Sequence, residues 1–453
     1  MRSDSAGGPG KNTPCELLTH LTRRLEAHPA SRYLIGYSGG LDSTVLLHLA
    51  ARLKGRFSFA ALHIHHGLSP EASLWERRCR ETCRSLAIPF ETVRIMVVPQ
   101  RGESPEEAAR RARYRAFEER LRDGEMLLLA HHAGDLVETV LLNLLRGGGL
   151  KGLSGIPETR PLGRGQLLRP LLHVPREVLR AYAEAQRLSW IEDGSNGDLR
   201  FDRNFLRHRV IPQIKERWPE LERTIARSAK HLDESRRLLD ELADEWLEEV
   251  APTPETLSLQ LLQRVPLKRQ RLILRRWLER QLGRPPSTDQ LVRIFGEVIA
   301  ARPDRIPELR IDRYLLRRYR KTLYLEPTHP SPSPNASLPW PKGEVALKLP
   351  GGDELRRLPR VGEGISAARW HAARVEVRFR QGGEVCRLPG RGRRPLKKLL
   401  WEWGIPPWRR DRLPLLYLDG HLAAIADLAV CEPFPAGPGE PGYRLLWLET
   451  RSP

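Results

Sequence analysis

The sequence predicts an α/β protein in which a doubly wound parallel sheet is followed by a helical domain and a small mixed α+β C-terminal domain. Between Tyr33 and Arg146, short apolar runs alternate with amphipathic segments, which is the pattern of a parallel sheet with crossover helices. From Pro212 to Leu325 the chain is rich in Leu, Arg and Glu with helical periodicity. Residues 343–453 follow a Pro/Ser run and mix short strand-like stretches with turns.

The elements of the predicted sheet alternate along the chain. We expect strands over Tyr33–Tyr37, Phe57–His65, Phe90–Val97 and Met126–His131. We expect helices near Asp42–Leu53, Ala72–Leu86, Pro105–Arg122 and Asp135–Leu145. In such sheets ligands bind beyond the carboxyl ends of the strands. The segments that follow the first, second and fourth strands are therefore predicted to meet at one edge and to form a site.

The segment between the first strand and its helix has the composition of a phosphate-binding loop. It reads Ser38, Gly39, Gly40, Leu41, Asp42 and Ser43. Two glycines let the backbone turn sharply and approach a ligand, and the N–H groups at a helix start favour an anion. Asp42 is placed to hold Mg²⁺ against phosphate oxygens. The alternative is an ordinary capped strand-to-helix turn, and the spacing differs from that of a Walker A motif.

The overall charge points to a polyanionic partner. The 453-residue chain carries a net charge of +20, with 29% charged and 40% hydrophobic residues, which is a globular composition. The alternative is a general arginine bias that raises the charge everywhere. Residues 1–14 are polar and contain no apolar core of a signal peptide, and no membrane span is expected.

The cysteines predict reduced thiols. Only two of the five lie close together, Cys79 and Cys83, and their spacing is not C-x-x-C. We therefore expect free, structural thiols, including Cys15, Cys386 and Cys431, in a cytoplasmic protein.

Five histidines, His63, His65, His66, His131 and His132, follow the second and fourth predicted strands. Their spacing fits no common zinc signature. We expect His63 to face the interior of the sheet. For His132, and for His66 as a second candidate, we expect a hydrogen-bonding role near a triphosphate.

Asp135 and Glu138 are spaced so that both carboxylates lie on one helix face. One interpretation is that they complement the helix dipole. The other is that they bind Mg²⁺ or a cationic substrate such as an amine. Arg110 and Arg113 likewise share a helix face, and they either form a solvated surface or hold phosphates bidentately.

The chain length is sufficient for about three domains. We place a domain with the predicted sheet and phosphate-binding loop at residues 15–211, a helical domain at 212–326, a Pro-rich linker at 327–342 and a C-terminal domain at 343–453. The segment from Arg387 to Lys398 has no acidic residue and contains Arg393, Arg394, Lys397 and Lys398. It is either a disordered basic loop or an ordered phosphate-binding surface, and the flanking Leu and Trp residues favour the ordered surface.

Several motifs occur in the order found in one enzyme family. They are SGGLDS at 38–43, HIHHGLS at 63–69, E-x-x-x-R-x-x-R-Y ending at Tyr114, AHH-x-x-D-x-x-ET at 130–139, EDGSN at 192–196 and RNFLRHRVIP at 203–212. Together they resemble the tRNA(Ile)-lysidine synthetases, within the PP-loop ATP pyrophosphatases. The resemblance covers Leu34 to Pro212 and resumes from Val375 through Lys398 and at 406–414, where it is similar to the C-terminal domain of the three-domain members.

The resemblance implies a two-step ligation on a minor isoleucine tRNA with a CAU anticodon. ATP would first adenylate the ring carbonyl oxygen of the wobble cytidine and release pyrophosphate. The ε-amine of free L-lysine would then displace AMP and give lysidine. ATP and Mg²⁺ are the implied cofactors, and the C-terminal domain would bind the tRNA. A homodimer is left open.

The resemblance also implies residue roles. The loop residues Ser38 to Ser43 would bind ATP, with Asp42 on Mg²⁺ and with Asp42, His132, Asp135 and Glu138 at the reacting centre. The residues implied to bind tRNA or substrate are Arg110, Arg113, Asp193, Asn204, Arg207, Arg393, Arg394, Lys397 and Lys398. Gly134 and Leu136 stand where relatives usually carry Asp and Gln, so the division of roles among Asp135, Glu138 and Asp193 stays open.

Two other functions compete with this assignment. A tRNA thiolase of the same superfamily would need C-x-x-C cysteines, which the chain lacks. A non-catalytic RNA-binding protein on a decayed scaffold is favoured only by Gly134. The intact loop at 38–43, with Asp42 and the paired Asp135 and Glu138, favours an enzyme.

Overall fold

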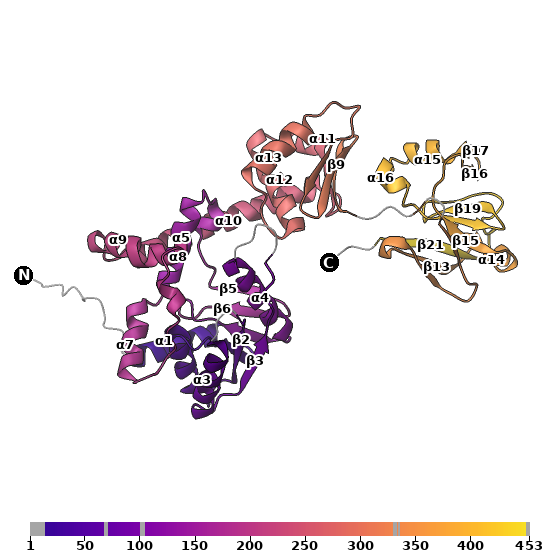
Figure 1. Ribbon diagram of the computed structural model, residues 1–453. Coiled ribbons are helices and arrows are strands. Elements are labelled where there is room, and N and C mark those ends of the chain that lie inside the picture. Colours follow the sequence, from indigo (N-terminus) through magenta and orange to yellow (C-terminus); the bar gives the residue numbers. More distant parts are fainter. Residues whose placement is uncertain (1–13, 68–70, 100–104, 329–332, 334–335, 450–453) are drawn as a thin grey trace, which may run out of the picture. The chain divides into compact units, whose positions relative to one another are not determined.

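The computed structural model describes residues 14–67, 71–99, 105–328, 333 and 336–449 (Figure 1). The chain forms two compact units, residues 1–239 and 240–453. Their boundary falls inside the long helix α10 (Leu221–Val250). Each unit is described by itself.

The first unit is built on a six-stranded sheet of order β3-β2-β1-β4-β6-β5. Strands β1, β2, β3, β4 and β6 run parallel, and β5 pairs antiparallel with β6 at the edge. The bounds are β1 Arg32–Gly36, β2 Phe59–His65, β3 Phe90–Arg94, β4 Glu125–Leu128, β5 Thr159–Leu162 and β6 Gly165–Leu168. The predicted parallel sheet is confirmed. The β5–β6 hairpin was not predicted, because its strands are only four residues long and β5 contains a proline.

Both faces of this sheet are covered by apolar side chains, as the near-continuous apolar strands require. Tyr33 and Ile35 point to a core that includes Leu46 of α2, whereas Leu34 points to a second core that includes Phe117 of α4. The helices are α1 Pro14–Ala27, α2 Leu41–Ala51, α3 Ala72–Ser85, α4 Pro105–Arg120, α5 Ala133–Leu145, α6 Leu150–Leu153 and α7 Arg176–Ala185. The four predicted crossover helices are therefore present.

Helices after the sheet complete the first unit. They are η1 Gly194–Gly197, α8 Asp202–Phe205, the π-helical turn η2 Leu206–Val210 and α9 Ile211–Arg217, followed by α10. Val137 of α5 packs with Leu206, Ile211 and Leu221, and Leu136 packs with Ala229 of α10. This packing fixes the segment at 202–217 against α5, which starts at the edge of the sheet that carries the predicted site.

The first part of the second unit joins helices to a sheet. The predicted helices are present as α10 and α12 (Leu267–Leu282), with α11 Leu259–Leu262, α13 Thr288–Arg293 and η3 Ile294–Ile299. The sheet, of order β7-β10-β9-β8, was not predicted; its strands are β7 Thr256–Ser258, β8 Glu308–Ile311, β9 Tyr314–Tyr319 and β10 Thr322–Pro327. Arginines interrupt the apolar alternation of these short strands, so their period is weak in the sequence.

The second part of this unit is rich in strands. Its sheets have the orders β11-β15-β18-β19-β20, β12-β13-β21-β14 and β16-β17. The strands are β11 Ser337–Pro339, β12 Ala346–Lys348, β13 Glu354–Val361, β14 Ile365–Ser366, β15 Val375–Arg378, β16 Val385–Leu388, β17 Gly392–Pro395, β18 Leu415–Leu418, β19 His421–Ile425, β20 Ala429–Val430 and β21 Pro441–Leu448, with helices η4 Pro350–Gly352, α14 Ala367–Ala372, α15 Leu396–Glu402 and α16 Pro407–Arg410.

Two features of this part refine the sequence interpretation. The later part of the predicted linker at 327–342 packs with the C-terminal sheets, because β11 pairs with β15 and Trp340 is buried in the core. The basic segment is ordered: it forms the β16–β17 hairpin and the start of α15. Among the described residues, no helix is both long and apolar enough to span a membrane.

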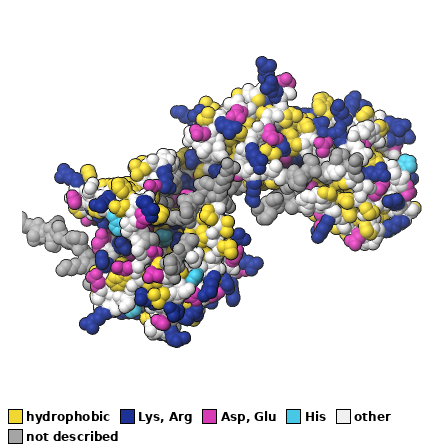
Figure 2. Space-filling model, in the orientation of Figure 1, with side chains coloured by type: hydrophobic (Ala, Val, Ile, Leu, Met, Phe, Trp, Pro, Cys, Tyr) yellow, Lys and Arg dark blue, Asp and Glu magenta, His cyan; other side chains and the backbone are white. Residues whose placement is uncertain are grey.

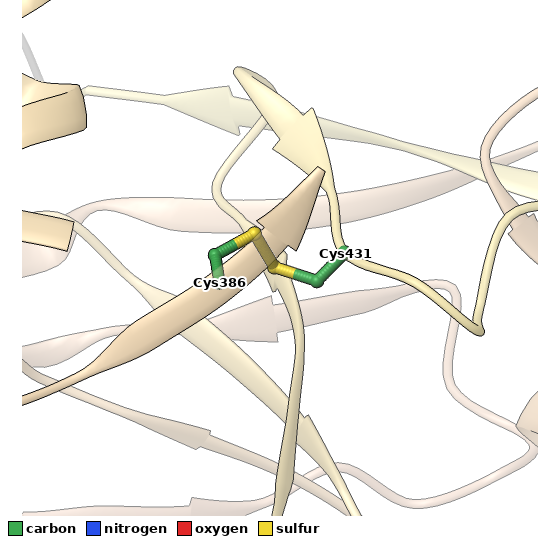
Figure 3. The surroundings of a disulfide bond; sticks show 2 residues. All are labelled: Cys386 and Cys431. Carbon is green, nitrogen blue, oxygen red and sulfur yellow. A yellow bond between two sulfur atoms is a disulfide. The ribbon is translucent and has the colours of Figure 1, made fainter. Parts of the chain in front are cut away.

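The expectation of five free thiols is wrong for one pair. Cys386 in β16 and Cys431 after β20 form a disulfide (Figure 3), and both residues are buried. Their separation of 45 residues in the sequence hid this contact, which only the folding of the hairpin onto the sheet creates. Cys79 and Cys83 are free, and burial raises the pKa of each thiol to about 12.

Replacing both Cys386 and Cys431 by Ala should lower the free energy of unfolding by about 4 kcal/mol. The physical reason is that a cross-link over 45 residues restricts the unfolded chain. Urea unfolding followed by circular dichroism measures the effect. Adding a thiol reductant should shift the wild-type curve to that of the variant and leave the variant unchanged; a wild-type curve insensitive to reductant would contradict the prediction.

Candidate active site at the carboxyl edge of the sheet

The loop after β1 is shaped to receive an anion. Gly39 has φ +84°, a conformation that favours glycine, and Gly40 is the N-cap of α2 without a side-chain cap. Ser43 Oγ donates to the Gly40 carbonyl at 3.0 Å and lies 3.0 Å from Ser38 Oγ. The first N–H groups of α2 are thus left uncapped by a side chain at the positive end of the helix dipole.

A second loop holds this turn in place. The Ile191 N–H donates to the Gly39 carbonyl at 2.9 Å. A Cβ atom on Gly39 would lie 2.5 Å from Ile191 Cδ1 and 2.8 Å from Cys79 Sγ. Glycine is therefore required here both for the backbone angle and for the close packing.

A cleft of about 500 Å³ opens beside the loop. It is lined by Ser38, Gly40, Leu41, Asp42, Arg176, Glu177, Arg180, Trp190, Ile191, Glu192, Asp193 and Arg207. The predicted residues Asp193 and Arg207 therefore lie with the loop, although they are far from it in the sequence. This convergence follows from the placement of α7 and of the segment at 190–210 over the carboxyl edge.

Asp42 has an unused ligand atom. Its Oδ1 is buried and has no hydrogen-bond partner among the described residues. Burial raises the pKa of Asp42, and the nearby His132 and Arg176 oppose that rise. A hard divalent cation accepts such a carboxylate oxygen, so the atom fits the Mg²⁺ role expected for Asp42. Within the described parts of the chain, no group of three or more potential metal-ligating side chains occurs.

His132 has two functions in one side chain. It caps α5, because its Nδ1 accepts a hydrogen bond from the Gly134 N–H at 3.0 Å. In a neutral ring the proton then lies on Nε2. Nε2 is 3.8 Å from Asp42 Oδ2 and 3.6 Å from Asp135 Oδ2. The imidazole is thus aimed between the loop carboxylate and α5, while His63 is buried with Nδ1 2.9 Å from the Tyr37 carbonyl oxygen, as expected.

Glu138 is held by two arginines of its own chain. The Arg207 Nε donates to Glu138 Oε1 at 2.5 Å, and the Arg203 Nε donates to Oε2 at 2.7 Å. Asp135 Oδ1 lies 3.3 Å from Arg203 Nη2 and 3.5 Å from Arg207 Nη2, and Asp135 Oδ2 accepts from the His132 N–H. From the sequence, Asp135 and Glu138 were expected either to complement the helix dipole or to bind Mg²⁺ or an amine. Their pairing with two arginine side chains of the same chain was not predicted.

Arg203 is a residue that the sequence interpretation did not select. It lies one helical turn before Arg207, so the spacing of four could have indicated a shared face. The same spacing of four residues occurs at the start of α7, where Arg176 and Arg180 line the cleft. Arg176 Nε is 3.9 Å from Asp42 Oδ1. These two arginines add positive charge on the wall beside the phosphate-binding loop.

Neighbouring histidine and arginine side chains extend the site toward α4. His131 Nδ1 accepts from Arg169 Nε at 3.2 Å, and burial lowers the pKa of His131 to about 3, so the ring is neutral. The charges of Arg110 and Arg113 contribute to that lower pKa. Both arginines are exposed, which is the condition for contact with a large anionic partner.

The remaining predicted residues are distributed over both units. Asn204 donates its side-chain N–H to the Asp198 carbonyl at 3.0 Å, so it braces the segment before η2. Arg393, Arg394, Lys397 and Lys398 lie on β17 and α15 of the second unit. They form a separate basic surface and not part of the cleft.

Comparison with known proteins matches three successive regions of the chain. Residues 15–214 match a PP-loop domain, 257–324 a TilS substrate binding domain and 375–447 a TilS substrate C-terminal domain. The chain is 42% identical to a tRNA(Ile)-lysidine synthase of Coxiella burnetii over 96% of both chains. It is 44% identical to one of Alkalilimnicola ehrlichii over 92% of this chain and 94% of the relative.

The chain belongs to the tRNA(Ile)-lysidine synthase family. The members of this family are ATP-using ligases with a PP-loop domain, and the chain is one of them. A solved U34-tRNA thiolase of Methanococcus maripaludis aligns with a TM-score of 0.41 and 16% identity over 48% of this chain and 78% of that one.

Gly134, which departs from the lysidine synthase pattern, has a structural role in this chain. A Cβ atom on Gly134 would lie 2.9 Å from His132 Cε1 and 3.1 Å from His132 Nδ1. Gly134 therefore gives the His132 ring room to cap α5 in its present orientation. Any larger residue at this position requires the imidazole to shift.

Replacing Gly39 by Ala should raise the KM for ATP at least tenfold and leave the helix and strand content unchanged. The added methyl group would clash with Ile191 and Cys79 at a positive φ, so the loop must move. ATP–pyrophosphate exchange measures KM, and circular dichroism reports the fold. Gly55→Ala is the matched control, because nothing lies within 4 Å of a Cβ there. Equal KM values for the two variants would contradict the prediction.

Proposed function

We propose that this protein ligates lysine to the wobble cytidine of the CAU anticodon of a minor tRNA(Ile), through an adenylated cytidine and with release of pyrophosphate and AMP. The observation that carries the proposal is the buried Oδ1 of Asp42, which has no hydrogen-bond partner among the described residues and lies beside an uncapped helix N-terminus in a cleft. That combination suits the triphosphate of ATP. The substrate assignment rests on the family and on the two close relatives named tRNA(Ile)-lysidine synthase.

In the first step, the ring carbonyl oxygen of the cytidine attacks the α-phosphorus of ATP. The bond between the α-phosphorus and the bridging oxygen breaks, and pyrophosphate leaves with the bond electrons. The N–H groups of residues 41–43 would hold the phosphate oxygens, and Arg176 and Arg180 would offset the charge that develops on the leaving group. Asp42 would hold Mg²⁺, which supplies further charge neutralisation when bound.

In the second step, the neutral ε-amine of lysine attacks the activated ring carbon. The new C–N bond replaces the C–O bond to AMP, and the amine releases a proton. Because both oxygens of Glu138 already accept from Arg203 and Arg207, we assign Glu138 to positioning those arginines and not to holding lysine. Asp193 lines the cleft, and we assign its carboxylate as the candidate for the substrate amine because of that position.

The RNA would be bound by arginine and lysine side chains in both units. Arg110 and Arg113 are exposed on α4, and Arg393, Arg394, Lys397 and Lys398 lie on the basic surface of β17 and α15. Arginine and lysine side chains bind the phosphates of a nucleic acid whatever its base sequence. Arg207, held by Glu138, points into the cleft, where it would contact a phosphate or the cytidine.

Asp42→Ala should abolish ATP–pyrophosphate exchange and the incorporation of labelled lysine into a CAU-anticodon tRNA(Ile) transcript. The loss follows because no other described carboxylate lies in the loop at 38–43. Asp123→Ala, at an exposed turn, should retain both activities. Wild-type exchange without lysine incorporation would refute the lysine assignment, and the absence of any exchange in the wild type would refute the adenylation step.

Arg176→Ala should raise the KM for ATP about tenfold, since it removes a cation that faces Asp42 and the cleft. Arg176→Lys should recover part of the loss, because the charge is restored without the planar guanidinium. Steady-state exchange at varied ATP concentration measures both variants. Arg84→Ala, on the exposed side of α3, is the control and should match the wild type. An unchanged KM in Arg176→Ala would remove this residue from the ATP site.

A further inference from the structure

Helix α15 in the second unit presents one exposed face of unusual composition. Leu396, Leu399 and Leu400 are buried in the core that also contains the disulfide. The helical spacing therefore turns Lys397, Lys398 and Trp401 to the other side. Trp401 is 60% exposed, whereas Leu399 and Leu400, which precede it in the sequence, are fully buried.

A cavity of about 290 Å³ lies on this face. It is lined by Pro395, Lys397, Lys398, Trp401 and Arg410. The guanidinium of Arg410 is already bonded, since its Nε donates to the Ile405 carbonyl at 2.8 Å and its Nη2 donates to Tyr319 Oη at 3.0 Å. The surface of the cavity is therefore mostly apolar and consists of the Trp401 indole and the methylene groups of Lys397 and Lys398, whose ammonium groups add positive charge beside it.

The indole of Trp401 has one cationic neighbour. The Arg320 guanidinium lies 5.1 Å from the Trp401 ring centroid and also donates to the Trp401 carbonyl. Arg320 lies 5.3 Å from the ring centroid of Tyr319 as well. An aromatic side chain has only two rotatable bonds, so its ordering costs little conformational entropy when a second ring stacks on it.

The charge around the cavity favours an anion. Figure 2 shows Lys and Arg side chains over this end of the second unit, where β16, β17 and α15 lie in Figure 1. Among the described residues, four basic side chains of this segment form no ion pair with a carboxylate: Arg393, Arg394, Lys397 and Lys398. An anionic ligand would neutralise these positive charges, whereas a purely apolar ligand would not.

We propose that this pocket, formed by Lys397, Lys398 and Trp401, binds an unpaired nucleotide of the RNA substrate. The base stacks on the indole of Trp401, and the two ammonium groups hold the flanking phosphates. The inference rests on the proposed function for the identity of the RNA and goes beyond it by separating a stacking site from the general basic surface. A base inside a duplex has both ring faces covered, and only the two terminal pairs expose one face, so a long duplex offers this pocket far fewer stacking partners than a single strand of equal length.

The test compares two labelled RNAs of equal length with the full-length protein. One is a single strand without self-complementarity and the other is a blunt duplex, and fluorescence anisotropy gives Kd. Trp401→Ala should weaken single-strand binding about tenfold, in keeping with the loss of one stacked base, and should change duplex binding less than twofold. Trp401→Phe should restore most of the single-strand affinity.

Matched variants separate stacking from charge and from folding. Trp218→Ala, in the first unit and similarly exposed, should leave both affinities unchanged. Lys397→Ala should weaken both RNAs and reduce the salt dependence of binding. An equal loss for both RNAs in Trp401→Ala, or no loss for either, would overturn the proposal, provided that the variant unfolds at the wild-type temperature.

Failure of this inference is distinguishable from failure of the proposed function. The RNA affinities need neither ATP nor lysine, so they are measured even if the wild-type protein incorporates no lysine. Conversely, wild-type lysine incorporation together with unchanged single-strand binding by Trp401→Ala would reject the stacking site and leave the ligase assignment in place.

Discussion

The arrangement of the site depends on the buried carboxylate of Glu138. Glu138 is 2% exposed, and a buried charge without partners would cost several kcal/mol. Arg203 and Arg207 supply those partners through short hydrogen bonds from a π-helical segment and the turn before it. The ion pairs therefore tie the segment at 202–210 to α5. Because Arg207 also lines the cleft, the same interaction orients a cation toward the phosphate-binding loop.

The π-helical turn η2 contributes to this geometry. A π-helical turn contains one extra residue per turn relative to an α-helix and often occurs at functional sites. Here it carries Arg207 and is followed by α9, whose Lys215 bridges Glu177 and Glu222 at 3.0 and 2.7 Å. Helices α7, α9 and α10 are thus joined by charge around the edge of the sheet. The phosphate-binding loop is held by the hydrogen bond from the Ile191 N–H to the Gly39 carbonyl. Both walls of the cleft are therefore stabilised by contacts with neighbouring segments.

The extent of prediction from sequence differs between parts of the chain. The four strands and four crossover helices of the first unit were predictable because their apolar periods are strong, as in Tyr33–Ile35. The sheet of β7–β10 was not, because residues such as Arg317 and Arg318 break the alternation that marks a strand. The loop at 38–43 was visible as a motif, whereas Arg176 and Arg203 were not, because each gains meaning only from the distant carboxylate that it faces.

The sequence by itself determined the chemistry that the protein can carry. The glycines and Asp42 of the loop, the carboxylates at 135 and 138 and the basic C-terminal segment are local patterns, and residue type alone limits what they bind. Only the tertiary structure decided how these groups are used. It paired Glu138 with two arginines, left Asp42 Oδ1 without a hydrogen-bond partner in the described part of the chain and joined Cys386 to Cys431. The physical reason is that charge pairing, burial and disulfide formation depend on distances between residues far apart in the chain, which no local pattern contains.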